Sequence, residues 1–277
     1  MFQNRLTTFS RLGLPLIVGV LVSCSGGGLS STGGSAGSGS DSGGGLQFSM
    51  GDLNGDWTGE LIPNNSSLIK RNVYIRVANG QLTDCAEGGG GDWDTSNASI
   101  QLDFNTQGFL DLAIASLADD ADLSLEGTMN IALNQINGTS RILQSGGGLL
   151  EGTFELRRSS GAGHFTIDLS EGEWQGQGSN SRDRFRVAGI EFDSVGAIVR
   201  AEVINPNSSI TVHSYSPGAG TLELTDDAIG RINNVLLYAD DGSTLTFEFL
   251  LINDEGTLVS GPGIDSVLGV GRVELTR

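Results

Sequence analysis

Cysteine and histidine are scarce in this chain. Two cysteines, Cys24 and Cys85, and two histidines, His164 and His213, stand among 277 residues. A secreted domain held by disulfides needs an even set of cysteines in its folded part, and Cys85 has no partner once Cys24 is modified. We therefore expect no disulfide framework. Acidic neighbours disfavour a thiolate at Cys85, which we interpret as a small, shielded residue.

The sequence also lacks a convincing catalytic or metal-binding set of residues. Neither histidine stands at ligand spacing from another ligand, so both are expected to be ordinary surface residues. Residues 33–37 fit G-x-S-x-G, but no strand or helix surrounds them. Residues 52–56 begin like a calcium loop, yet Trp57 replaces the glycine that its turn requires. We expect no enzyme activity, no metal and no cofactor; weak calcium binding by aspartate clusters is the alternative.

Basic residues are few as well. The chain has 15 Lys and Arg against 33 Asp and Glu, and a formal charge of −18. Without Arg5 and Arg11, which belong to the leader described next, 13 basic groups face 33 acidic ones, a charge of about −20. Such a surface repels nucleic acid and anionic lipid head groups. A nucleic-acid partner is therefore not expected.

Residues 1–23 have the pattern of an export signal. Arg5 and Arg11 precede an apolar run, residues 12–22, that is too short to span a bilayer. The run ends Leu-Val-Ser-Cys24, which resembles the lipobox of bacterial lipoproteins. The resemblance implies cleavage before Cys24 and a diacylglycerol on its thiol, so that a lipid bilayer is the first partner. In Gram-negative lipoproteins, a residue other than Asp after the cysteine, here Ser25, favours the outer membrane.

The segment after the lipobox cannot form a core. Seventeen of the 21 residues from 25 to 45 are Gly or Ser. Such a segment is a flexible linker with a typical reach of ~25 Å. Residues 24–48 are therefore interpreted as the lipidated cysteine and its tether.

From about residue 50 the chain alternates apolar and polar residues, as in 73–77, 100–104 and 247–251. This period of two is typical of strands with one buried face. Turn pairs separate the runs, and we expect hairpins at Asn79-Gly80, Asn137-Gly138, Asp241-Gly242 and Glu255-Gly256. No long helical pattern interrupts them. The prediction is an all-β, antiparallel meander.

Two halves of this region align in the same order. The matched segments are 54–59 with 171–176, 100–103 with 222–225, 137–139 with 255–257, and 152–158 with 271–277. The pattern indicates a duplication, with repeats at 49–160 and 163–277 that each fold independently. Each repeat holds roughly eight short strands, a number that commonly closes into a barrel. The predicted fold is two tandem up-and-down β-barrels, with two β-sandwiches as the alternative.

The ends of each repeat resemble the lipocalin (calycin) pattern. A Gly-x-Trp opens each repeat, at Trp57 and Trp174, and an arginine closes it, at Arg158 and Arg277. The resemblance implies a clasp, in which each arginine covers the tryptophan of its own repeat. It does not extend further, since the other lipocalin motifs and a short N-terminal helix are not evident.

These observations favour a membrane-anchored, non-catalytic protein that displays two β domains for binding or for a structural role. A lipocalin-like carrier of a small apolar ligand is the second hypothesis, and an enzyme is the third. The partner could be an unidentified protein or a small apolar molecule. An open apolar cavity in a barrel would favour the carrier, and filled barrels would favour display.

Overall fold

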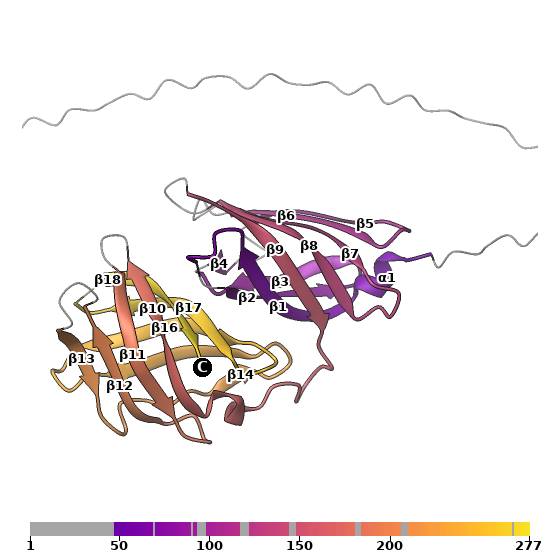
Figure 1. Ribbon diagram of the computed structural model, residues 1–277. Coiled ribbons are helices and arrows are strands. Elements are labelled where there is room, and N and C mark those ends of the chain that lie inside the picture. The colour runs from indigo at the N-terminus through magenta and orange to yellow at the C-terminus, as the bar shows by residue number, and fades with distance from the viewer. Residues whose placement is uncertain are drawn as a thin grey trace, which may run out of the picture. The chain divides into compact units, whose positions relative to one another are not determined.

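The computed structural model describes residues 47–68, 70–89, 91–92, 98–116, 122–143, 148–180, 184–205, 210–267 and 269–277. The expected signal peptide, Cys24 and nearly all of the tether lie outside these residues. The described chain is almost entirely antiparallel β-structure, which confirms the predicted fold class (Figure 1). No helix in the described part is long and apolar enough to cross a membrane.

The first repeat forms one nine-stranded sheet in the order β4-β3-β2-β1-β9-β8-β7-β6-β5. Its strands are β1 Gly55–Pro63, β2 Arg71–Ala78, β3 Gln81–Glu87, β4 Gly91–Asp92, β5 Ala98–Phe104, β6 Phe109–Ser116, β7 Asp122–Met129, β8 Gln135–Leu143 and β9 Leu149–Arg158. Strands that follow one another in the chain pair as in a meander, and the first strand, β1, also pairs with the last, β9. We call this sheet barrel 1.

The second repeat forms a sheet in the equivalent order, β13-β12-β11-β10-β18-β17-β16-β15-β14. Its strands are β10 Gly172–Asn180, β11 Arg184–Phe192, β12 Ile198–Ile204, β13 Thr211–Tyr215, β14 Leu224–Asp226, β15 Arg231–Tyr238, β16 Thr244–Ile252, β17 Leu258–Asp265 and β18 Gly269–Thr276. We call it barrel 2. Identical strand order over nine strands is what a duplication produces.

Pairing of the first and last strands makes each sheet a curled, nearly closed barrel. β1 pairs with β9 and β10 with β18, all antiparallel. Among the described residues no ladder joins β4 to β5 or β13 to β14, so strand pairing alone does not complete either barrel. Two separate sheets packed face to face would not share this continuous hydrogen-bonded order, so the sandwich alternative does not describe the fold.

Several details correct the sequence-based expectations. Each repeat has nine strands rather than eight, because short pieces such as β4 carry too little alternation to be noticed. A short helix does precede each first strand: α1 Met50–Leu53 and the 3₁₀ helix η1 Ile167–Ser170. Phe48, assigned to the tether, packs edge-on against Phe104 with ring centroids 6.1 Å apart. The folded body therefore begins before residue 49.

One of the four expected hairpin turns was wrong. Asn79-Gly80, Asp241-Gly242 and Glu255-Gly256 do lie in turns, whereas Asn137-Gly138 lies inside β8. The turn between β7 and β8 is instead built on Asn130. Its side-chain oxygen accepts hydrogen bonds from the backbone N–H groups of Asn134 and Gln135, at 3.1 and 3.2 Å.

Barrel 2 repeats this turn in atomic detail. Asn253, between β16 and β17, accepts hydrogen bonds from the N–H groups of Thr257 and Leu258, at 2.8 and 2.9 Å. A side-chain amide that closes a turn in this way replaces a backbone carbonyl as acceptor. The true match for residues 253–257 is therefore 130–134, and not the segment around 137 that the sequence comparison chose.

Each barrel encloses its own apolar core. Eighteen buried apolar residues, from Leu53 to Leu156, fill barrel 1, and twenty-one, from Phe165 to Leu275, fill barrel 2. Trp57 and Trp174 are both fully buried. Cys85 is also fully buried, which confirms the interpretation of a shielded thiol.

The two barrels also contact one another through a third apolar cluster. Tyr74 and Ala86 of barrel 1 pack with Phe249 and Leu251 of barrel 2. Hydrogen bonds beside this cluster also join the two barrels. The side-chain nitrogen of Asn72 donates to the carbonyl oxygens of Leu251 and Leu258, at 2.6 and 3.0 Å. Cross-barrel bonds of this kind satisfy backbone groups that burial would otherwise leave unpaired.

A buried ion triad completes this contact. The guanidinium of Arg71 lies 3.5 Å from a carboxylate oxygen of Glu87 in barrel 1 and 3.3 Å from one of Glu274 in barrel 2. All three side chains are almost wholly buried. A buried charge needs its partners, because solvent cannot replace them.

Candidate functional site

The structure brings together both expected tryptophan–arginine pairs. In barrel 1, Trp57 pairs with Arg158 across β1 and β9, and the guanidinium carbon lies 4.5 Å from the indole centroid. In barrel 2 the corresponding distance from Arg277 to Trp174 is 5.1 Å. Both distances are within the range for a cation–π contact.

Hydrogen bonds hold the indole and the guanidinium in place. Trp57 Nε1 donates to the carbonyl of Leu53, at the end of α1, at 2.8 Å. Arg158 donates to the carbonyl oxygens of Leu133, at 2.8 Å, of Asn54, at 2.6 Å, and of Asp52. Burial lowers the pKa of Arg158, with a smaller opposing effect of Asp52. The arginine thus ties α1 and the β7–β8 turn to the end of the barrel.

Barrel 2 uses the same arrangement. Trp174 Nε1 donates to the carbonyl of Ser170, at the end of η1, at 2.7 Å, and Arg277 donates to the carbonyl of Glu171. The short helices were missed from the sequence because four residues show no 3.6-residue period. The signal that could have found α1 is the Ser49-x-x-Asp52 capping box before the first Gly-x-Trp, and η1 has no such box.

Two pairs of glycines make the clasp possible in different ways. Gly55 and Gly172 adopt φ of +132° and +117°, and the arginine guanidinium lies against each of them. Gly59 and Gly176 instead allow close approach of the last strand, since a Cβ there would overlap the carbonyl oxygens of Glu155 and Glu274. The contacts of the clasp therefore serve to close the fold.

The interior of barrel 2 contains a small cavity of about 20 Å³. Its walls are mainly apolar, and Tyr215, among them, has a buried hydroxyl without a hydrogen-bond partner. Burial raises the pKa of Tyr215, with further contributions from Asp265 and Asp241, so the hydroxyl keeps its proton. A cavity of this size has room for about one water molecule.

His213 is buried, so the expectation of a surface histidine was wrong. Its Nδ1 lies 2.9 Å from Ser243 Oγ and 3.1 Å from Asp241 Oδ2, and its Nε2 lies 3.4 Å from Asp265 Oδ1. Ser243 Oγ also donates to Asp241 Oδ1 at 2.6 Å, and its one proton cannot serve both neighbours. We interpret the cluster as a polar cap, in which the β15–β16 turn covers the end of barrel 2.

His164 is also more enclosed than expected. It precedes Phe165 in the segment that joins the barrels, and its Nε2 lies 3.4 Å from Asp254 Oδ1. Asp254 also accepts a hydrogen bond from Thr58 Oγ1 of barrel 1 at 3.1 Å. This histidine therefore belongs to the contact between the repeats. Among the described residues, no three His, Cys, Asp or Glu side chains gather as metal ligands would.

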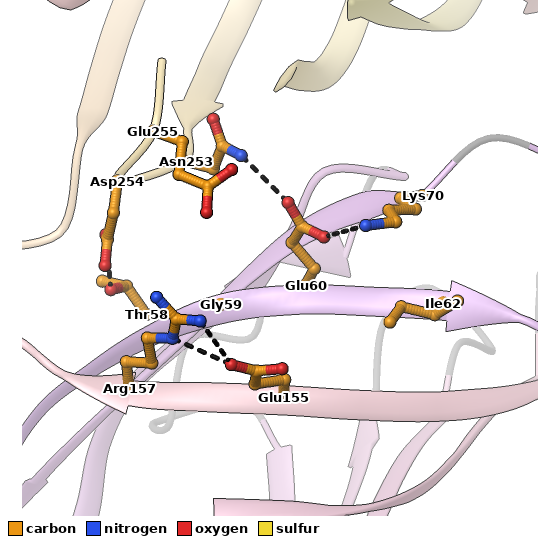
Figure 2. A pocket seen from close by; sticks show the side chains of 10 residues that line it. All are labelled: Thr58, Gly59, Glu60, Ile62, Lys70, Glu155, Arg157, Asn253, Asp254 and Glu255. Atoms are coloured by element: carbon orange, nitrogen blue, oxygen red, sulfur yellow. Dashed lines mark hydrogen bonds and ion pairs between the residues drawn. The ribbon is translucent and has the colours of Figure 1, made fainter. Parts of the chain in front are cut away.

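A cavity of about 170 Å³ lies where the β16–β17 turn meets the wall of barrel 1 (Figure 2). The residues that line it are Thr58, Gly59, Glu60, Ile62, Lys70, Glu155, Arg157, Asn253, Asp254 and Glu255. Figure 2 shows Lys70 directed to Glu60 and Arg157 to Glu155, at 2.7 and 2.8 Å. Most of its charges are thus already paired, and we interpret it as the polar rim of the barrel–barrel contact.

No protein-family model and no curated protein matches the chain. Among solved structures, a protein of unknown function from the DUF3598 family of Nostoc punctiforme is 14% identical, over 81% of this chain and 95% of that one, with a TM-score of 0.23. A Bacteroides fragilis protein, whose assignment to the outer membrane is itself provisional, is 12% identical over 82% and 97%, with a TM-score of 0.24. Scores this low carry no argument about function.

Proposed function

We propose that this chain is a lipid-anchored envelope protein that displays a body of two barrels and acts through its outer surface. The anchor is inferred from the lipobox that ends at Cys24, outside the described residues. The Gly/Ser segment then acts as a spacer between the lipid and the barrels. The outer membrane is the proposed location, because Ser25 follows the cysteine.

The filled barrel interiors support action through the surface. Buried side chains as large as Trp57 and Phe154 fill the core of barrel 1, and the cavity in barrel 2 measures about 20 Å³. Pockets for small organic ligands usually measure ~300–1,000 Å³. A hollow of about 460 Å³ in barrel 1 reaches this size, but it is lined by exposed residues such as Gln101, Arg141 and Leu149 and lies on the outer wall. A barrel packed in this way acts as a rigid scaffold, and its turns and outer walls are the parts available to a partner.

The anchor is tested by labelling cells that express the chain with a radioactive fatty acid. We expect label in the parent chain, no label in Cys24→Ala, and release of that variant from the membrane fraction. Cys85→Ala is the matched control and should keep the label, because this thiol is buried in barrel 1. Label retained by Cys24→Ala would contradict the proposal.

A carrier of a small apolar ligand is the second candidate, and the unpartnered hydroxyl of Tyr215 inside barrel 2 is the observation that favours it. This hydroxyl would donate to one polar atom of the ligand, and the cavity of about 20 Å³ would have to widen to admit that ligand. The test is denaturing mass spectrometry of the parent chain and of Ala201→Val, which adds two methyl groups to the cavity wall. A small molecule that co-purifies with the parent and is lost from the variant would establish the carrier. A parent chain without a bound molecule would favour display.

A further inference from the structure

Half of the exposed large apolar side chains of the described residues gather at one end of barrel 2. Ten such side chains are exposed in all, and five of them belong to this end: Ile210, Leu236, Tyr238, Ile264 and Val267. Clustered exposed apolar residues mark contact with a protein or a membrane more often than scattered ones do. The cluster is called the apolar end of barrel 2 below.

The strand register shows that these residues share one end. The hairpin between β15 and β16 starts at Tyr238, which pairs with Thr244, and Asp265 pairs with both Leu245 and Gly269. Thr244 and Ser266 exchange two hydrogen bonds, each of 2.8 Å, which join that hairpin to the one that carries Val267. Leu236 and Ile264 both pair with Thr246, so they lie in the same row.

Ile210 reaches the same end from the β12–β13 side. It lies directly before β13, and its carbonyl accepts a 2.9 Å hydrogen bond from the N–H of Asn205. The β15–β16 turn is fixed to β13, because the Asp240 N–H donates to the Ser214 carbonyl at 2.8 Å. The exposed fractions of Ile210, Tyr238 and Val267 are 65%, 59% and 67%, so these three project furthest.

We infer that the apolar end of barrel 2 rests on the surface of the bilayer that holds Cys24. The inference depends on the proposed lipid anchor. Some 22 residues separate Cys24 from the described chain, a linker that spans at most about 75 Å when fully extended. The bilayer is therefore the apolar phase that is always within reach, and tethering raises its effective concentration.

The side chains suit an uncharged lipid surface. Aliphatic tips enter the boundary between head groups and acyl chains, and a tyrosine places its hydroxyl among the head groups. Asp240 and Asp241 stand at the same end, and the mature chain has a formal charge of about −20, so anionic lipids would repel it. The His213 cap closes the barrel behind the patch, which indicates contact rather than entry of lipid.

The experiment uses the full chain, recovered in lipidated form and reconstituted into vesicles of phosphatidylcholine with brominated acyl chains. Bromine quenches tryptophan only when the ring enters the acyl region. Val267→Trp is the test variant, and Ile131→Trp is the matched control, because Ile131 is 74% exposed on a turn of barrel 1. The parent chain, with three tryptophans, supplies the background to be subtracted.

We expect the added tryptophan of Val267→Trp to lose most of its emission and that of Ile131→Trp to keep it. Anionic lipid in the vesicles should weaken the quenching. If both variants are lipidated and neither is quenched, or both are quenched equally, the inference is overturned and the proposed anchor stands. Protein that carries no lipid and does not sediment with vesicles overturns the proposed function, and this inference falls with it.

Discussion

At the scale of single residues, Arg158 and Arg277 each join parts of a repeat that are far apart in sequence. Arg158 covers Trp57 and donates to carbonyl oxygens of α1, the chain before β1 and the β7–β8 turn. An arginine makes several such bonds at once because its donors are fixed in one plane. A lysine at the same place would keep the charge and lose most of these contacts.

Replacement of Arg158 should therefore be costly, and replacement of its neighbour should not. For Arg158→Ala we expect a loss of roughly 2–4 kcal/mol in the free energy of unfolding, from the cation–π contact and the charged hydrogen bonds. Arg157→Ala should cost under about 1 kcal/mol, because Arg157 is exposed and its ion pair with Glu155 lies in solvent. Urea unfolding measures both, and equal losses would show that the clasp does not stabilise the barrel.

The cap at His213 predicts an acid-sensitive contribution to stability. Hydrogen bonds from Ser243, and then His213, lower the pKa of Asp241 to about 2. Because the unfolded value is about 3.9, this contribution is fully present above about pH 4 and is lost as the pH falls towards 2. Asp241→Asn should therefore unfold at lower urea than the parent at pH 5, and the gap should close near pH 2.

Glu223→Gln is the control for this pH dependence, because Glu223 is exposed and its side chain makes none of the contacts described here. Its urea midpoint should follow that of the parent at every pH. A gap between Asp241→Asn and the parent that stays constant from pH 5 to pH 2 would mean that the carboxylate acts through packing and not through its charge.

The clasp could be anticipated from sequence because closure of a meander fixes which strands meet. A Gly-x-Trp in the first strand and an arginine at the end of the last must then lie side by side. The environment of His213 could not be anticipated in this way. Its partners Asp241, Ser243 and Asp265 come from a turn and a strand that lie 28 to 52 residues further along the chain, and only the register of β13, β15 and β17 brings them together.

At the scale of the elements, alternation was a sound guide to strands and a poor guide to some turns. Asn-Gly is favoured in tight turns because both residues tolerate positive φ, and Asn79 and Gly80 do adopt it, at 53° and 72°. In β8 the glycine of the same dipeptide is required for another reason, since a Cβ on Gly138 would overlap the carbonyl oxygen of Glu126 on the adjacent strand. A dipeptide alone does not distinguish these two reasons for glycine.

Close strand approach at the barrel closure gives a sharp test. Gly59→Ala should destabilise barrel 1 by about 3 kcal/mol or more, because the new methyl group meets the backbone of Glu155 and Leu156 and not a flexible side chain. Gly51→Ala is the control, since it lies in α1 and a Cβ there would meet only Ser49 Oγ, at an ordinary contact distance of 3.5 Å; it should be neutral or stabilising by up to ~1 kcal/mol. Thermal unfolding followed by circular dichroism compares them; a Gly59→Ala variant as stable as Gly51→Ala would contradict the closure of β1 on β9.

At the scale of the whole molecule, the two repeats contact one another through unlike faces. Barrel 1 uses β2 and β3, whereas barrel 2 uses β16 to β18 and the β14–β15 turn. Contacts of this type can in principle add further copies without end. The repeats can be aligned on the asparagines that close the β7–β8 and β16–β17 turns. In this alignment Phe249 and Leu251 of barrel 2 correspond to Glu126 and Thr128 of barrel 1, which are polar and exposed. Barrel 1 therefore lacks the apolar face that barrel 2 uses in this contact.

The contact between barrels was not predicted from sequence. Residues 247–251 read as a simple alternating strand, but a register irregularity in β16 turns Phe249 and Leu251 towards barrel 1 while Leu250 and Ile252 face the interior. The sequence pattern within one repeat also gave no reason to expect that Arg71 is buried. Independent folding of residues 163–277 was the expectation, and the contact predicts instead that this half alone is less stable than it is within the chain.

Arg71 tests the contact at one position. Arg71→Met leaves Glu87 and Glu274 buried without their counter-charge, and we expect a loss of about 3–5 kcal/mol in the free energy of unfolding. Arg141→Met is the control, because Arg141 pairs with Glu151 in solvent and should contribute under about 1 kcal/mol. Urea unfolding compares the two variants, and a loss no larger for Arg71→Met than for Arg141→Met would show that the triad is not needed.

The claim that the two barrels form one body is tested most directly by hydrogen exchange of the full chain in increasing urea. Mass spectrometry can follow peptides from β2, residues 71–78, and from β16, residues 244–252, in the same sample. The cross-barrel bonds and the shared triad predict that both peptides become exposed in one cooperative step, at the same urea concentration. Exposure of one barrel's peptide while the other stays fully protected would contradict the claim.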